Sequence, residues 1–190
     1  MRTISHTHRL AGVLAAASIL GLVATGCSIN PATGSLPEQS AQVQLRATRV
    51  DQPLAAKPVE GMIRFAEMKD GSTRITGEVK NLKPNSIVGF HIHEKGDCSA
   101  PDGMSAGAHF NPTGMQHGAP GHGHIGDLPA LQADAMGTAK VQYVSQGIKL
   151  AGPNGVVGKA VIVHRDPDDI NAQPAGNSGP RLACGVISAS

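Results

Sequence analysis

Aromatic side chains are almost absent from this chain of 190 residues, which has no Trp, one Tyr and three Phe but 24 Gly and 13 Pro. Such a composition is more typical of short strands joined by turns and loops than of helices. No stretch repeats its apolar residues with a sustained helical period either. We therefore expect an all-β protein.

Uninterrupted apolar stretches are also short. The run from Leu10 to Val23 has about 14 residues, fewer than the roughly 20 that a membrane-spanning helix needs, which disfavours a retained transmembrane segment. Arg2 and Arg9 provide a positive start before this run, and small residues follow it. This arrangement is typical of a bacterial export signal, so we expect residues 1–26 to be removed.

The residues Ala-Thr-Gly-Cys at 24–27 resemble the lipobox of bacterial lipoproteins, in which the cysteine becomes the acylated first residue of the mature protein. This resemblance predicts a lipid on Cys27 that anchors the protein to a membrane, with plain secretion or a free thiol as the alternative. Ser28 stands where an aspartate commonly retains lipoproteins at the inner membrane. We therefore expect an exported protein of the periplasm and cell envelope, with the outer membrane favoured.

An excess of charge of one sign is missing from the expected mature chain. Loss of Arg2 and Arg9 lowers the count of Lys and Arg from 16 to 14, which equals the 14 Asp and Glu, so nothing favours a nucleic-acid partner. Cysteine is scarce too, since only Cys98 and Cys184 occur besides Cys27. In an exported protein two cysteines most simply form one disulfide, and two unpaired buried thiols are the alternative.

The mature chain divides into a tether and one domain. Residues 27–40 contain several breakers and no hydrophobic period, which indicates a flexible tether, and residues 41–190 suit one domain with its own core. Alternating apolar residues predict strands, with a hairpin turn at Lys69-Asp70-Gly71. The expected strands are Ala41–Val50, Val59–Met68, Ser72–Lys80, Ile87–His93, Ala133–Val144, Val156–His164 and Leu182–Ser188.

Two long segments, 94–130 and 165–181, lie between these strands and are rich in Gly, Pro, Asp and His. Loops longer than about 15 residues are uncommon unless they are functional. About eight antiparallel strands with two long functional loops predict a Greek-key β-sandwich or flattened β-barrel.

Histidines gather in and beside these segments. His91 and His93 flank Ile92, and because side chains alternate along a strand, both imidazoles should share one face while Phe90 and Ile92 face the core. A single His-x-His pair is often no more than two exposed histidines. His164 ends an apolar strand, where a buried histidine with one backbone partner is the alternative to a metal ligand.

The first long segment adds further groups that can bind metal. Imidazole suits both copper and zinc, and a carboxylate added to three histidines makes a closed tetrahedral zinc site. Two kinds of metal site can therefore be drawn from this sequence. The additional candidate ligands are His109, His117, His122, His124 and Asp127.

Five segments resemble, in this order, the signature segments of the copper/zinc superoxide dismutases: GFHIHEKGDC, SAGAHFNP, HGAPGHGHIGDLPAL, VIVHRDPDDI and GPRLACGVI. The resemblance extends over roughly residues 59–187. It implies an enzyme with one copper and one zinc ion that converts superoxide to dioxygen and hydrogen peroxide by redox cycling of copper. Such an enzyme would protect the cell envelope from external superoxide.

The resemblance also implies a role for individual residues. The copper ligands would be His91, His93, His109 and His164. The zinc ligands would be His109, His117, His124 and Asp127. His109 would bridge the two ions and take up a proton on its copper side during the cycle.

Three further roles follow from the same resemblance. Arg181 would hold the incoming anion above the copper ion, and Asp168 would link a copper histidine to a zinc histidine. Cys98 and Cys184 would form the disulfide of the family. The segment 165–181 is shorter than the electrostatic loop of eukaryotic members and lacks clear counterparts of their steering Glu and Lys.

Two alternative functions use the same residues. A non-catalytic copper-binding or copper-storage module would need no anion-guiding Arg181, and a copper-only dismutase would need no zinc ligands. His122 competes with His124 for the third zinc position, and we assign His124 because HIGDL follows it. A monomer and a homodimer are both compatible with the sequence.

Overall fold

The computed structural model of the protein describes residues 39–49 and 57–190. The expected signal, Cys27 and most of the expected tether lie outside these residues. Within them no helix is long and apolar enough to cross a membrane, and the helical structure is limited to the 3-10 helix η1 (Met104–Ala106). The strands of this part are β1 (Gln39–Ala47), β2 (Glu60–Glu67), β3 (Thr73–Lys80), β4 (Ile87–Val88), β5 (Phe90–His93), β6 (Leu131–Gln132), β7 (Ala139–Ser145), β8 (Ala160–His164), β9 (Arg181–Val186) and β10 (Ser188–Ala189).

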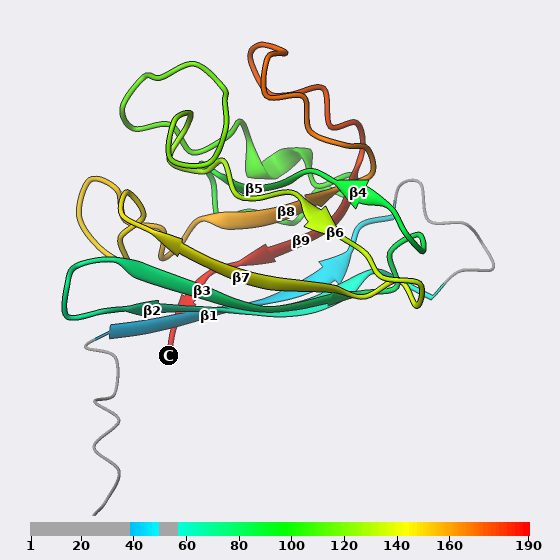
Figure 1. The fold of residues 1–190 in the computed structure, drawn as a ribbon, viewed down its shortest axis with the longest axis horizontal. Helices are drawn as coiled ribbons and strands as arrows, with labels where there is room; N and C mark the ends of the chain where they lie inside the picture. Colours follow the sequence, from blue (N-terminus) through cyan, green and yellow to red (C-terminus); the bar gives the residue numbers. More distant parts are fainter. Residues whose placement is uncertain (1–38, 50–56) are drawn as a thin grey trace, which may run out of the picture. The chain divides into compact units, whose positions relative to one another are not determined.

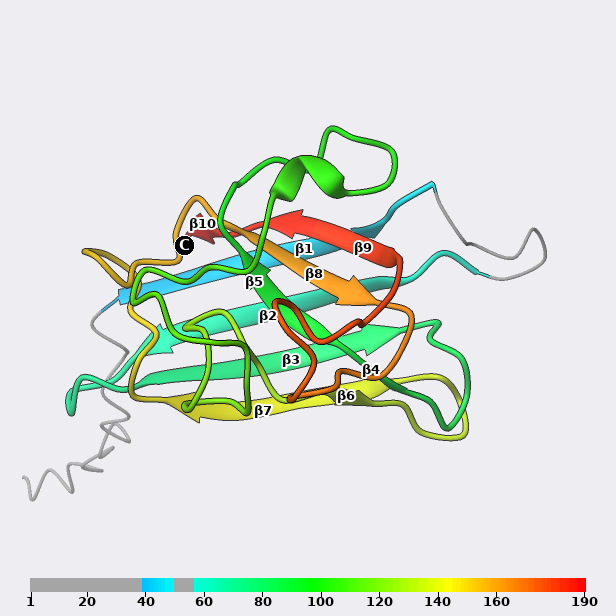
Figure 2. The ribbon, with the colours of Figure 1, turned by 90° about the horizontal axis from the view of Figure 1, so that it is seen from above.

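Strand β1 connects two layers of antiparallel strands. Its residues Gln39 to Leu45 pair with β2, whereas its last two residues, Arg46 and Ala47, pair with β9. The strand order is β5-β8-β9-β1-β2-β3-β7, and Figures 1 and 2 show β5, β8 and β9 lying over β1, β2, β3 and β7. The expected all-β Greek-key fold is therefore confirmed.

The main core lies between the two layers and contains alternate residues of their strands. Burying one such aliphatic or aromatic side chain stabilises the fold by about 1.5–3 kcal/mol. Phe90 and Ile92 of β5 belong to this core, as their alternation predicts, together with Val161 and Val163 of β8. From the other layer come Val43, Leu45, Ile63, Phe65, Ile75 and Val79.

A second, smaller cluster lies on the opposite face of β8. Ala160 and Ile162 pack there against Ala106 of η1 and Cys184 of β9. Cys184 is joined to Cys98 by a disulfide, with a Cα–Cα distance of 5.8 Å. The segment after β5 thus covers the outer face of β8, which explains why all five residues of this strand are buried.

The two long segments follow β5 and β8, as expected, and both lie on the outer side of the layer that contains these strands (Figure 1). They therefore face away from the main core. This arrangement leaves the outward-pointing residues of β5 and β8 covered by loops instead of by a second sheet.

Three expected strands are wrong in their extent, because local hydrogen bonds interrupt the alternating pattern. Ile87–His93 is divided at Gly89, whose amide donates to Asp166 of the second long segment. The strand expected from Ala133 begins at Ala139, since the Asp134 carboxylate accepts hydrogen bonds from two following amides and makes a turn. The strand expected from Val156 begins at Ala160, after a turn in which the amide of Lys159 donates to Val156.

Candidate metal centre

The outward face of β5 carries His91 and His93. Alternation along the strand sends Phe90 and Ile92 into the core and the two imidazoles to the side of the long loops. Both are almost completely buried, with 0% and 1% of the residue surface exposed. Burial of unpaired polar groups is costly. The two imidazoles therefore need polar partners or a metal, whether they are neutral or charged.

The edge of β5 is hydrogen bonded to two stretches of the first long loop. The amide of Phe110 donates to the Ile92 carbonyl at 2.8 Å, and the Ile92 amide donates to the Gly126 carbonyl at 2.9 Å. These bonds place His109 opposite His93 and Asp127 opposite His91. A loop that pairs with the strand edge thus brings ligands from distant sequence positions to the β5 histidines.

His164 reaches the same place from the end of β8. An irregularity between Val163 and His164 shifts the register with β9, and the imidazole lies 4.9 Å from that of His91, centroid to centroid. Its Nδ1 is 3.2 Å from the carbonyl oxygen of Gly179 in the second long loop. With Nδ1–H donating to this carbonyl, only Nε2 is left for another partner.

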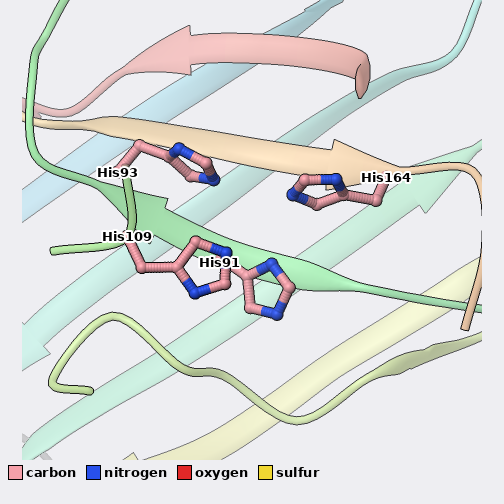
Figure 3. A group of neighbouring side chains, drawn as sticks. All are labelled: His91, His93, His109 and His164. Atoms are coloured by element: carbon pink, nitrogen blue, oxygen red, sulfur yellow. The ribbon is translucent and has the colours of Figure 1, made fainter. Parts of the chain in front are cut away.

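Four histidines form the first group of potential ligands, and Figure 3 shows their rings turned toward one another. One ring nitrogen from each lies within 4.8 Å of those of the others. Within the described part of the chain, the buried Nδ1 of His91 and the Nε2 atoms of His93 and His164 have no hydrogen-bond partner. Since His93 Nδ1 is 2.9 Å from the Gly107 carbonyl, the free nitrogens are those that face the group. The members are His91, His93, His109 and His164.

The second group places three Nδ1 atoms around one carboxylate. Oδ1 of Asp127 lies 2.9 Å from Nδ1 of His109 and 3.3 Å from Nδ1 of His124, and Oδ2 lies 3.1 Å from Nδ1 of His117. Three imidazoles and one carboxylate are the ligand set of a closed tetrahedral zinc site. His109 belongs to both groups, so its two ring nitrogens can each serve one metal.

The protonation states suit metal binding, which requires neutral imidazole and ionised carboxylate. Burial lowers the pKa of His91 and His93, and it lowers the pKa of His164 to about 3. Burial by itself raises the pKa of Asp127, but hydrogen bonds from His109 and from the Gly118 amide outweigh it, so this pKa is lowered. Near neutral pH all four groups are therefore in the form that binds a cation.

The sequence and the fold of this chain are similar to those of known proteins. The model of the copper/zinc superoxide dismutases matches residues 59–187. A superoxide dismutase [Cu-Zn] 2 from Brassica juncea is 43% identical over 141 residues, which cover 70% of this chain and 91% of the relative. The crystal structure of the clock protein EA4 is similar, with a TM-score of 0.68 and 33% identity, over 81% of this chain and 96% of that chain.

The chain belongs to the copper/zinc superoxide dismutase family. The enzyme class and the copper and zinc cofactors expected from the sequence are thereby confirmed. Both groups fit the ions of the family, because each brings four buried side chains together with one potential ligand atom of each within 4.8 Å of the others.

Around the first group, this superoxide dismutase places Arg181, the first residue of β9. Its Nη1 donates to the Gly103 carbonyl at 2.9 Å and its Nη2 to the Gly107 carbonyl at 2.7 Å. The positive charge lies near enough to lower the pKa of both His93 and His164, in each case as a smaller effect than burial. A cation fixed at this position can attract and hold an anion.

Asp168 lies between the two groups. One carboxylate oxygen is 3.2 Å from Nε2 of His91, and the other is 3.2 Å from Nε2 of His117. Ser178 donates to Oδ1 at 2.7 Å. Burial by itself would raise the pKa of this carboxyl, but hydrogen bonds from His91 and Ser178 outweigh burial, and the pKa is lowered to about 2. Such outer carboxylates fix the tautomer and orientation of metal-binding imidazoles.

His122 is exposed and belongs to neither group of potential ligands, whereas His124 is buried in the second. The difference arises in the turn at HIGD, where the His124 amide donates to Asp127 Oδ2 at 2.9 Å.

The carbonyls of Gly103, Gly107 and Gly179, which accept from Arg181, His93 and His164, could not be found from the sequence. Every residue has a main-chain carbonyl, so the residue type does not show which carbonyl will act as an acceptor.

Proposed function

We propose that the two groups of histidines are the copper and zinc sites of an exported superoxide dismutase. Copper would be held by the first group, zinc by the second, and His109 would serve both. The observation that carries this assignment is the sharing of His109 between two buried clusters of ligand atoms. Copper, when bound, supplies the one-electron redox change that superoxide dismutation requires.

The residues of the chain supply the remaining parts of the reaction. Arg181 draws superoxide toward the first group, and its two bonds to main-chain carbonyls hold its guanidinium in one place. His109 keeps Nδ1 beside Asp127, so its Nε2 is the nitrogen that can take up and release a proton. Two superoxide anions and two protons then give dioxygen and hydrogen peroxide.

Metal analysis combined with a superoxide decay assay tests this assignment. We expect one copper and one zinc per chain, and decay faster than that caused by the same concentration of free metal. His164→Ala should lose the redox activity, whereas Asp127→Ala should mainly lose zinc. Full activity and full copper content in His164→Ala would contradict the ligand assignment, and decay no faster than the free-metal control would favour a copper-storage module. Copper without zinc in the native protein would favour a copper-only enzyme.

The proposed location is the cell envelope, with the domain anchored through a lipid on Cys27. Support comes from the sequence alone, namely the positive start, the short apolar run and the lipobox-like residues 24–27. Growth with a clickable palmitate should label the native protein but not Cys27→Ser, and the label should fractionate with the outer membrane. An unlabelled native protein in the soluble periplasmic fraction would overturn the anchor.

A homodimer would show as a doubled mass in sedimentation of the same protein.

A further inference from the structure

Gln173, in the second long loop, binds both main-chain groups of His117. Its Oε1 accepts from the His117 amide at 3.0 Å, and its Nε2 donates to the His117 carbonyl at 2.9 Å. The two residues are 56 positions apart. Because a main-chain amide only donates and a carbonyl only accepts, this pair of bonds also determines which end of the glutamine amide is oxygen.

Within the described residues, the main chain of His117 has no hydrogen bond to another main-chain group. In contrast, His91 and His164 lie in strands, where ladder bonds fix the main chain. His117 therefore depends on the Gln173 side chain for the main-chain support that strand pairing gives to His91 and His164.

The ring of His117 is held by the same loop. Asp168 Oδ2 lies 3.2 Å from its Nε2. Gly176 packs so closely that a Cβ there would meet His117 Nε2 at 2.6 Å. The loop is closed on itself, since the Asp169 amide donates to the Gly176 carbonyl and the Gly176 amide to the Ala172 carbonyl. One compact turn thus fixes both the main chain and the far side of the imidazole, leaving Nδ1 directed at Asp127.

We propose that Gln173 is a positioning residue of the zinc site, which locks the main chain of His117 and thereby slows the loss of zinc. This inference rests on the proposed assignment of His117 as a zinc ligand. It predicts that a change at Gln173 affects the binding of zinc but not the binding of copper. Removing the lock should loosen a ligand that binds only zinc, and should leave the copper ligands on β5 and β8 in place.

The test compares Gln173→Ala with Gln142→Ala, in which an exposed glutamine of β7 is removed instead. Zinc release into a chelating indicator is timed for proteins loaded with copper and zinc, and retained copper is then measured. Outer-shell substitutions typically cost 10–100-fold in metal affinity, so we expect about 10-fold faster zinc release from Gln173→Ala, with copper retained. Gln173→Glu keeps the acceptor for the His117 amide but turns the donor into a second acceptor that faces the His117 carbonyl, so it should also release zinc faster than the native protein.

The absorption spectrum of Co²⁺ bound in place of zinc gives a readout besides activity and rate. Its ligand-field bands should change in Gln173→Ala and stay unchanged in Gln142→Ala. Zinc release within twofold of the control, or an equal loss of copper and zinc, would overturn the inference. His117→Ala distinguishes its failure from that of the proposed function, because a zinc content unaffected by this change would show that His117 is not a ligand at all.

Discussion

The guanidinium of Arg181 donates to the carbonyl oxygen of Gly107 at 2.7 Å. The same oxygen lies 2.9 Å from Nδ1 of His93. One peptide group therefore orients both a histidine of the first group and the cation expected to hold the substrate. The position of that peptide depends on Gly107, which has a φ of 77°.

Gly107→Ala should disturb this shared carbonyl. A Cβ would be strained at positive φ and would meet Glu94 at 2.5 Å from its Oε1 and 2.9 Å from its Cγ, so the peptide or the Glu94 side chain must shift. We expect kcat/KM for superoxide to fall about 10-fold, a barrier increase of about 1.4 kcal/mol, with copper still bound. Gly114→Ala is the matched control, because Gly114 has a φ of 67° but no atom within 4 Å of the added Cβ. An equal effect of both changes would assign the loss to backbone strain alone.

Arg181→Ala should lower kcat/KM by at least about 10-fold and weaken its dependence on ionic strength. Superoxide dismutases are themselves a standard example of electrostatic steering, which salt screens. Arg181→Lys keeps the charge but has no planar fork to bind two carbonyls, so it should retain the salt dependence with a lower rate. The measurement is superoxide decay from low to high salt, with Arg74→Ala on β3 as control. An unchanged salt slope in Arg181→Ala would argue against this role.

Much of the first group could be predicted from the sequence, because strand alternation has a strict period. Alternation alone placed Phe90 and Ile92 in the core and His91 and His93 on the opposite face, and the structure confirms the two core positions. The position of His164 at a strand end was also visible. The apolar run that precedes it needs burial on both sides, which the segment around Ala106 provides.

The supporting contacts could not be predicted in the same way. Gln173 is one glutamine in a polar loop, and its two hydrogen bonds to the His117 main chain form only because the loop folds back over His117. The carbonyls of Gly103 and Gly107 depend on backbone direction, which residue type does not encode. Strand ends were missed where a side chain such as Asp134 satisfied amides locally and competed with sheet pairing.

Reduction of the disulfide between Cys98 and Cys184 should destabilise the domain by about 2–4 kcal/mol, a typical value for a natural disulfide. It should also affect Arg181, because Gly103, which accepts from Arg181 Nη1, follows Cys98 in the same loop. We expect a lower urea midpoint with reductant and a partial loss of activity below that midpoint. The double variant Cys98→Ser/Cys184→Ser should show both effects without reductant and no further response to it. An identical midpoint in the oxidised and reduced proteins would contradict this prediction.

The metal-free protein should lose stability in mild acid. His164 has its pKa lowered by burial, and further by the charge of His91, to about 3, whereas in the unfolded chain it is about 6.5. Below pH 6.5 the unfolded chain takes up a proton at this position and the folded chain does not, so the free energy of unfolding falls until the pH reaches about 3. The lowered pKa of His93 acts in the same direction. Each such histidine contributes up to about 1.4 kcal/mol per pH unit.

Urea unfolding of the metal-free protein between pH 7 and pH 4 measures this dependence. The free energy of unfolding should decrease steadily across the range, and His164→Gln should show a shallower decrease by up to one proton, because glutamine does not titrate. His122→Gln is the control, since His122 is exposed and lies outside both groups of potential ligands. If His164→Gln kept the slope of the native protein, the neutral buried state of His164 would be wrong. The folded protein would then protonate His164 at an ordinary pKa, and that proton would compete with copper for this imidazole already in mild acid.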